Sequence, residues 1–118
     1  MGRLVFDEGS LTGKLTPQTK FPEGDFRSGY FAGDRLPRTV ARVKKIESDL
    51  EGSGYTISQA AIKFALAHPA MSTIIPGMRN VAQVDANVAV AELPDLPEQL
   101  LATLRRHIWL RGNWHAGK

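Results

Sequence analysis

The sequence of 118 residues contains no cysteine, which excludes disulfide bonds and thiolate metal sites. It also has no run of about 18 apolar residues, the length that a helix needs to cross a membrane. Met1 is followed directly by Gly2 and Arg3, without the apolar stretch of a secretory signal peptide. From these absences we expect a cytoplasmic protein with no membrane partner.

A large charge of either sign is missing as well. Fifteen lysine and arginine residues stand against twelve acidic residues, which leaves a net charge of +3. Basic residues gather at positions 35–45 and 105–111, but Asp34, Glu47 and Asp49 surround the first group, as on an ordinary solvent-exposed helix. No platform of aromatic and basic residues is evident. We therefore expect no nucleic-acid partner.

What the chain does contain is enough apolar sequence for a core, with 42% hydrophobic residues and a mean hydropathy of -0.21. Residues 3–6 are apolar and β-favouring, and glycines follow at positions 9 and 13, so we predict a strand that enters a loop. Residues 14–33 combine prolines, glycines and aromatic residues without a helical or strand period. We expect a long irregular excursion there, packed down by its aromatic side chains.

The first predicted helix covers residues 36–51, because four apolar residues recur there on one side: Val40, Val43, Ile46 and Leu50. A second helix starts at a capping box, in which the Thr56 hydroxyl accepts from the Gln59 N–H. It ends before Pro69, which forces the preceding residue out of the helical region. Its alanine-rich composition permits close approach to a neighbouring element.

A second strand and two more helices complete the pattern. Residues 72–75 form a short β-branched run that ends at a Pro-Gly pair, as expected of a buried strand. A third helix starts at Asn80, and Asp95 is the predicted N-cap of a fourth. Residues 108–118 are expected to be irregular. This order is typical of parallel βα units, so we predict an α/β chain, mostly helical, with two short parallel strands.

The corner between the second strand and the third helix, within residues 72–91, is a candidate anion site. The start of a helix carries a partial positive charge and outward N–H groups, and Arg79 adds a full charge. Strand-to-helix corners also occur in α/β proteins that bind nothing there, so the pattern alone fits a structural role as well as a binding role. The other candidates, each suited to approach a phosphate or a planar ring, are Gly77, Met78, Gln83 and Asn87.

These segments together resemble the aldo-keto reductase family. The stretch IIPGMRNVAQVDAN is similar to a family pattern of the form I-P-G-x-x-x-x-x-Q-x-x-E-N. DEGSLTGKLT resembles the G-x-L-T-G-K run of the loop after the seventh barrel strand. FPEGDFRSGYF and ISQAAIKFALAHPAMSTIIPG continue the resemblance in the same order and spacing, so it covers nearly the whole chain.

The resemblance implies that residues 1–118 are a single partial domain, the C-terminal fragment of a (β/α)8 TIM barrel with strands 7 and 8 and their helices. It implies an oxidoreductase that binds NADPH and reduces carbonyls by hydride transfer. Ala86 replaces the acid of the family pattern, which removes one contact near the adenine ribose. The implied cofactor contacts are the 2′-phosphate with Gly77, Met78 and Arg79, the adenine with Gln83 and Asn87, and the pyrophosphate with Phe6, Asp7, Leu11, Gly13 and Lys14.

We assign no catalytic residue, because the family's catalytic aspartate, tyrosine, lysine and histidine lie on earlier strands for which this chain has no room. His68, His107 and His115 lack the partner that acid–base catalysis requires, so they are expected to be structural or solvent-facing. Lys14 fits a solvated loop lysine as well as a phosphate ligand. The chain would then be inactive alone. The alternative is a truncated, non-catalytic protein that binds a complementing chain or itself through exposed strand edges.

Overall fold

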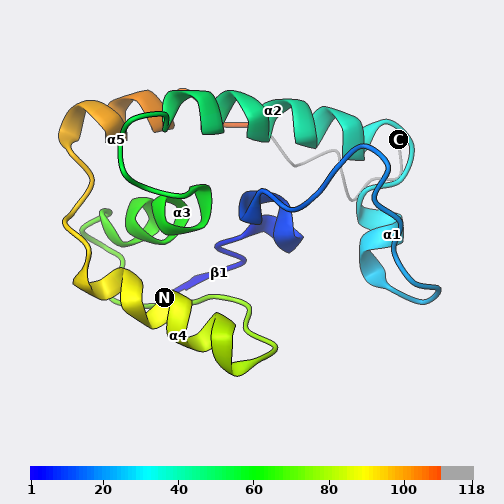
Figure 1. Ribbon diagram of the computed structural model, residues 1–118, viewed down its shortest axis with the longest axis horizontal. Coiled ribbons are helices and arrows are strands. Elements are labelled where there is room, and N and C mark those ends of the chain that lie inside the picture. Colours follow the sequence, from blue (N-terminus) through cyan, green and yellow to red (C-terminus); the bar gives the residue numbers. More distant parts are fainter. Residues whose placement is uncertain (110–118) are drawn as a thin grey trace.

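A computed structural model describes residues 1–109, in which the two strands and the four predicted helices follow one another in the predicted order (Figure 1). Most of the described chain is helical, and the two strands are short, so this part of the prediction is confirmed. The strands are β1 (Gly2–Arg3) and β2 (Ile74–Ile75), the α-helices are α1 (Phe26–Tyr30), α2 (Arg35–Asp49), α3 (Ile57–Leu66), α4 (Val81–Ala89) and α5 (Glu98–Arg105), and the 3-10 helices are η1 (Asp7–Thr12) and η2 (Val90–Glu92).

The two strands pair in parallel, as the sequence predicts. The strand predicted at residues 3–6 is shorter and begins earlier, because the backbone turns into the left-handed region at Leu4, with a φ of 57°. The strand predicted at residues 72–75 is limited to its last two residues. The paired residues are Gly2 with Ile74 and Arg3 with Ile75.

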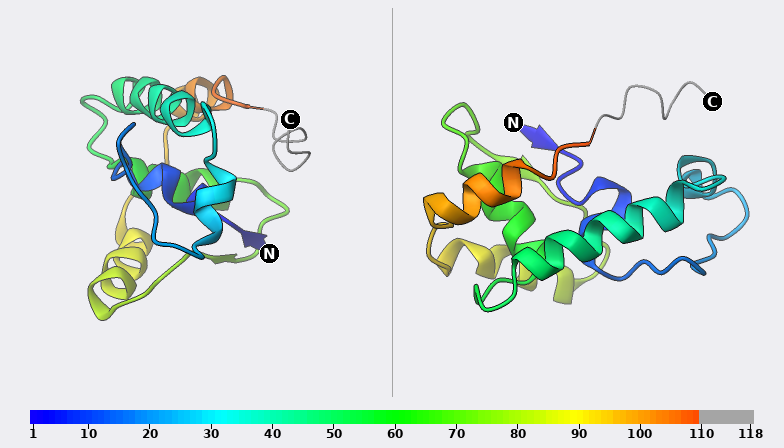
Figure 2. Two further views of the ribbon diagram at one scale, coloured as in Figure 1. Left: turned by 90° about the vertical axis from the view of Figure 1, so that its right-hand side faces the viewer. Right: turned by 90° about the horizontal axis from the view of Figure 1, so that it is seen from above.

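Helix α2 organises the core. It lies along the top of Figure 1, with α1 near one end, α5 near the other and α3 below it, and Figure 2 shows the same arrangement from two further sides. The four residues predicted for its apolar side are all buried. One cluster, between α2 and α3, contains Val43, Ile46, Leu50, Ile57 and Ala60, and a second joins α2 to the excursion through Tyr30, Phe31, Leu36 and Val40.

The excursion at residues 14–33 is less irregular than predicted, because it contains the short helix α1. Asp25 caps this helix by accepting from a backbone N–H two residues further on, at 2.9 Å. The aromatic residues pack as predicted: the rings of Phe21 and Phe31 stack with centroids 5.5 Å apart, and Phe31 is only 4% exposed. Phe26 is the exception, with 64% of its surface exposed.

One predicted helix cap is confirmed and another is wrong. The Thr56 hydroxyl accepts from the Gln59 N–H at 3.3 Å, and the Gln59 side chain accepts from the Thr56 N–H at 2.9 Å. Asp95, by contrast, does not cap α5, which begins at Glu98. Its carboxylate instead accepts from the Lys63 ammonium at 3.2 Å, because Lys63 is buried and its charge needs an acidic partner.

The described helices include none with the length and apolar character that spanning a bilayer requires. Residues 108 and 109 have no regular structure, in agreement with the predicted irregular tail. The rest of that tail, with the basic residue Arg111 and His115, lies outside the described residues.

Candidate functional site

A groove of about 690 Å³ lies where the turn after β1 meets the corner after β2. The parallel pairing explains why two distant segments meet here, since the carboxyl ends of parallel strands lie at the same edge of a sheet. Most of the residues predicted to bind a cofactor are brought together in this groove. They are Phe6, Asp7, Lys14, Gly77, Arg79, Gln83 and Asn87.

Three other predicted contacts, Leu11, Gly13 and Met78, have no place in the groove. Leu11 packs against the core between α2 and α3. Gly13 ends η1 with a φ of 71°, a backbone conformation that strains any residue with a Cβ, so the glycine has a structural role. Met78 is 44% exposed to solvent.

The turn after β1 has an unusual backbone that buried hydroxyl groups hold in place. Leu4, Asp7 and Glu8 have φ angles of 57°, 49° and 54°, which are uncommon for residues other than glycine. The Ser10 hydroxyl donates to Asp7 Oδ2 at 2.7 Å, and the Tyr30 hydroxyl donates to Asp7 Oδ1 at 2.7 Å. Both carboxylate oxygens of Asp7 are therefore engaged within the protein, and the residue fixes the shape of the turn.

The corner after β2 caps its own amide groups with side chains. Asn80 Oδ1 accepts from the Gln83 N–H at 2.9 Å, which confirms the predicted N-cap. Gln83 Oε1 accepts from the Arg79 N–H at 2.7 Å. These two amide groups are thus engaged within the protein, which corrects the expectation that they point outward toward an anion. The guanidinium of Arg79 is the stronger anion-binding group at this corner.

The Arg79 guanidinium lines the groove and has no carboxylate within 4.0 Å among residues 1–109. Arg3 and Lys14 line the same groove, are exposed, and likewise form no ion pair within the described part of the chain. Three basic side chains that form no ion pair among residues 1–109 therefore line this groove, together with the acidic residues Asp7, Glu8 and Asp25. Such an arrangement suits a ligand that carries phosphate groups.

Asp25 and Arg27 also line the groove, and neither residue was predicted from the sequence. The Arg27 guanidinium donates to both carboxylate oxygens of Asp25. This interaction lowers the pKa of Asp25 from 3.8 to about 2, and the positive charge of Arg79 adds to the lowering. Since the folded-state pKa is depressed, the stabilisation is present above pH 3.8 and is lost as the pH falls through about 2. The sequence feature that could have indicated this ion pair is an acid two residues before an arginine, just after the turn at residues 22–24.

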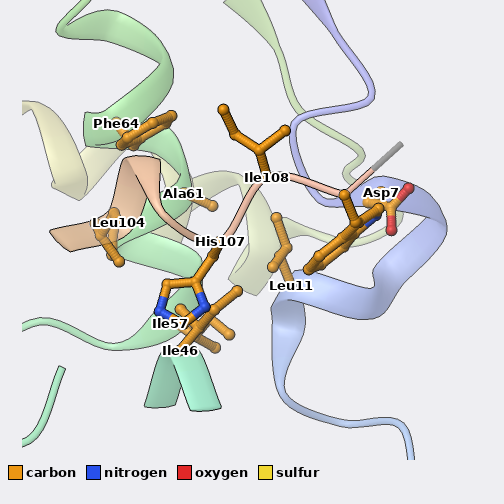
Figure 3. A pocket seen from close by; sticks show the side chains of 11 residues that line it. Asp7, Leu11, Ile46, Ile57, Ala61, Phe64, Leu104, His107 and Ile108 are labelled. Atoms are coloured by element: carbon orange, nitrogen blue, oxygen red, sulfur yellow. The ribbon is translucent and has the colours of Figure 1, made fainter. Parts of the chain in front are cut away.

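Asp7 also borders a second, apolar cavity of about 300 Å³, to which α2, α3 and α5 contribute residues (Figure 3). His107 lines this cavity, and its Nε2 lies 2.6 Å from Asp49 Oδ2. The prediction that no histidine has an acidic partner is therefore wrong for His107, because α5 packs against the end of α2. The imidazole borders the apolar cavity and does not line the groove. His68 accepts from the Ala70 N–H at 3.2 Å, a local structural contact.

Comparison with known proteins supports the family resemblance. The model of the aldo/keto reductase family matches residues 2–108. A search of curated proteins found no match, and a search of solved structures found none. The family match extends from β1 to the residues after α5 and includes every segment that lines the groove. The chain therefore belongs to the aldo/keto reductase family.

Proposed function

We propose that this chain is the cofactor-binding, C-terminal part of a (β/α)8 aldo/keto reductase barrel and that it binds NADPH in the groove. In this assignment β1 and β2 are the seventh and eighth barrel strands, and residues 1–118 form one partial domain. The observation that carries the proposal is the Arg79 guanidinium, which lines the groove and forms no ion pair within 4.0 Å among residues 1–109. Enzymes of this family are oxidoreductases that generally use a nicotinamide cofactor.

The residues of the groove fit a phosphorylated dinucleotide. Arg79 and Lys14 would provide charged donors to phosphate oxygens. Asn87 Nδ2 is shielded from solvent and has no hydrogen-bond partner in the described part of the chain, so an acceptor on a nucleobase edge would satisfy it. Ala86 lines the groove at the position of the family's acid and offers no such contact to a ribose. Bound NADPH would supply the hydride that reduces a carbonyl group.

Within this proposal no residue of the chain is assigned a catalytic role. His107 has an acidic partner but borders the apolar cavity. The acid–base groups would be carried by the other strands of the barrel, in further sequence or in a complementing chain. Residues 1–118 alone are then expected to bind the cofactor without reducing a carbonyl.

Titration with NADP⁺ tests the proposal. We expect binding of one cofactor per chain by isothermal calorimetry, and a rise in melting temperature, because a ligand at a hundred times its Kd stabilises the folded state by about 2.7 kcal/mol. Parallel titration with NAD⁺, which lacks the 2′-phosphate, is the matched control. If millimolar NADP⁺ produces neither heat nor a shift in melting temperature, the proposal is wrong.

A second proposal, association with another chain, is favoured by apolar side chains on the surface. Helix α4, at the bottom edge of Figure 1, has no buried residue. Val81 and Val88 are 74% and 64% exposed, and with Val84 they share one face of the helix. Ile75 of β2 is 53% exposed. Such a surface fits a contact with other barrel elements or with a second copy of the chain.

The variant Val88→Lys tests this association. Light scattering of the unmodified chain is expected to give a mass above the 12.9 kDa of one copy, and the lysine is expected to lower the mass toward that value, because burying its charge is unfavourable. Ala102→Lys introduces the same side chain at an exposed position of α5 and should leave the mass unchanged. A mass of one copy at all concentrations of the unmodified chain would contradict self-association.

A further inference from the structure

The excursion at residues 14–33 brings a further guanidinium to the groove, that of Arg27, beside those of Arg3 and Arg79. The Tyr30 hydroxyl attaches the excursion to the turn after β1 through Asp7, and the stacked rings of Phe21 and Phe31 attach it to the core. The Arg27 guanidinium lies over the Phe21 ring, 4.9 Å from its centroid. Packing of the excursion, as well as the ion pair with Asp25, therefore holds Arg27 at the groove.

The Arg27 guanidinium forms an ion pair with the Asp25 carboxylate. Arg27 Nε lies 3.0 Å from Asp25 Oδ1, and Arg27 Nη2 lies 2.6 Å from Asp25 Oδ2. A guanidinium uses the same two-point geometry for a phosphate group. The charge of Arg79 also contributes to the low pKa of Asp25, so this carboxylate experiences two guanidinium groups from segments that are far apart in the sequence.

We propose that Arg27 is a further phosphate-binding residue and that Asp25 holds it in place of the ligand when the groove is empty. A phosphate group that binds in the groove would replace the Asp25 carboxylate as the partner of Arg27 and as the anion near Arg79. This inference rests on the proposed dinucleotide site. Asp25 then competes with the ligand, because the Asp25–Arg27 ion pair must break before the phosphate can bind. Glu8, which lines the same groove, adds a second negative charge near Arg27.

The variant Asp25→Asn separates this competition from the structural role of Asp25. Asparagine caps a helix as well as aspartate does, so α1 is retained while the charge is removed. We expect Asp25→Asn to bind NADP⁺ about tenfold more tightly at low ionic strength, a difference of about 1.4 kcal/mol, and the gain should shrink as salt is added. Arg27→Gln should bind about tenfold more weakly. The control is Asp34→Asn, which removes an exposed acid that does not line the groove.

The two dinucleotides distinguish the phosphate groups. A gain for both NADP⁺ and NAD⁺ assigns Arg27 to the pyrophosphate, and a gain for NADP⁺ alone assigns it to the 2′-phosphate; both results support the inference. An unchanged or weaker affinity of Asp25→Asn, when the unmodified chain binds NADP⁺ and circular dichroism shows the variant folded, overturns it.

Failure of the dinucleotide site is a separate outcome. If the unmodified chain binds neither dinucleotide, the proposed function fails, and titration with inorganic pyrophosphate then decides the inference. Tighter binding of pyrophosphate by Asp25→Asn than by the unmodified chain supports the exchange of partners at Arg27. Equal binding, or none by either protein, contradicts it.

Discussion

Replacing Arg79 with glutamine is expected to weaken NADP⁺ binding about 10- to 100-fold, because a hydrogen bond to a charged group contributes about 1.5–3 kcal/mol. The loss should fall on NADP⁺ and spare NAD⁺, since the guanidinium is assigned to the 2′-phosphate. The fold should be unaffected, because the structural contact of Arg79 is made by its backbone N–H to Gln83. Calorimetric titration of both cofactors measures the difference.

The control for Arg79→Gln is Arg106→Gln, which removes the same charge from an exposed position after α5. Because Arg106 does not line the groove, its loss should leave both affinities within about twofold of the unmodified chain. An equal loss of NADP⁺ and NAD⁺ affinity in Arg79→Gln would contradict the 2′-phosphate assignment.

Replacing Phe31 with alanine is expected to lower the free energy of unfolding by about 3–5 kcal/mol, the usual cost of truncating a buried phenylalanine. Phe31 is 4% exposed and contacts two other rings, with centroid distances of 5.5 Å to Phe21 and 4.8 Å to Tyr30. For a chain of this size each kcal/mol corresponds to several degrees of melting temperature, so a fall of more than about 10 °C should follow. Urea denaturation monitored by circular dichroism provides the measurement.

Phe26→Ala is the matched control for Phe31→Ala, because it removes the same side chain from the same excursion at a position that is 64% exposed. Its effect should stay below about 1 kcal/mol, since little apolar surface is returned to water. Similar losses in the two variants would mean that the excursion is not anchored by the aromatic cluster. The unfolding experiment therefore also tests how Arg27 is held at the groove.

Local patterns predicted the helices well. The buried side of α2 follows from apolar residues at helical spacing, and the start of α3 from the reciprocal bonds of Thr56 and Gln59. Both features depend only on residues within about four positions of one another. The N-cap of α4 at Asn80 was predictable for the same reason.

Features that depend on distant partners could not be predicted in this way. Residues 3–6 have a β-favouring composition, yet Leu4 is left-handed, in a turn held by contacts of Asp7 with Ser10 and Tyr30. Asp95 has the spacing of a helix N-cap, but its carboxylate forms an ion pair with the buried ammonium of Lys63 instead. Helix α1 is too short to produce an apolar period.

In the candidate site, too, the features set by local sequence were predicted and those set by distant contacts were not. Its two halves were predicted as separate segments, and the parallel pairing of β1 and β2 brings them together. Leu11 and Gly13 were included because they belong to a matching run of sequence, but the 3-10 helix directs Leu11 into the core and places Gly13 against Glu47. Arg27 was not predicted, because the packing of the excursion against the core and the turn after β1 is what brings it to the groove.

Helix α4 supplies Gln83 and Asn87 to the groove although none of its residues is buried. A segment with so little buried surface opens locally at a much smaller free energy than global unfolding requires. Only molecules in which α4 is ordered present the complete groove. The apparent affinity for the cofactor is therefore the intrinsic affinity multiplied by the fraction of molecules in which α4 is ordered. A neighbour that packs on the valines of α4 would raise that fraction and tighten cofactor binding without touching the cofactor.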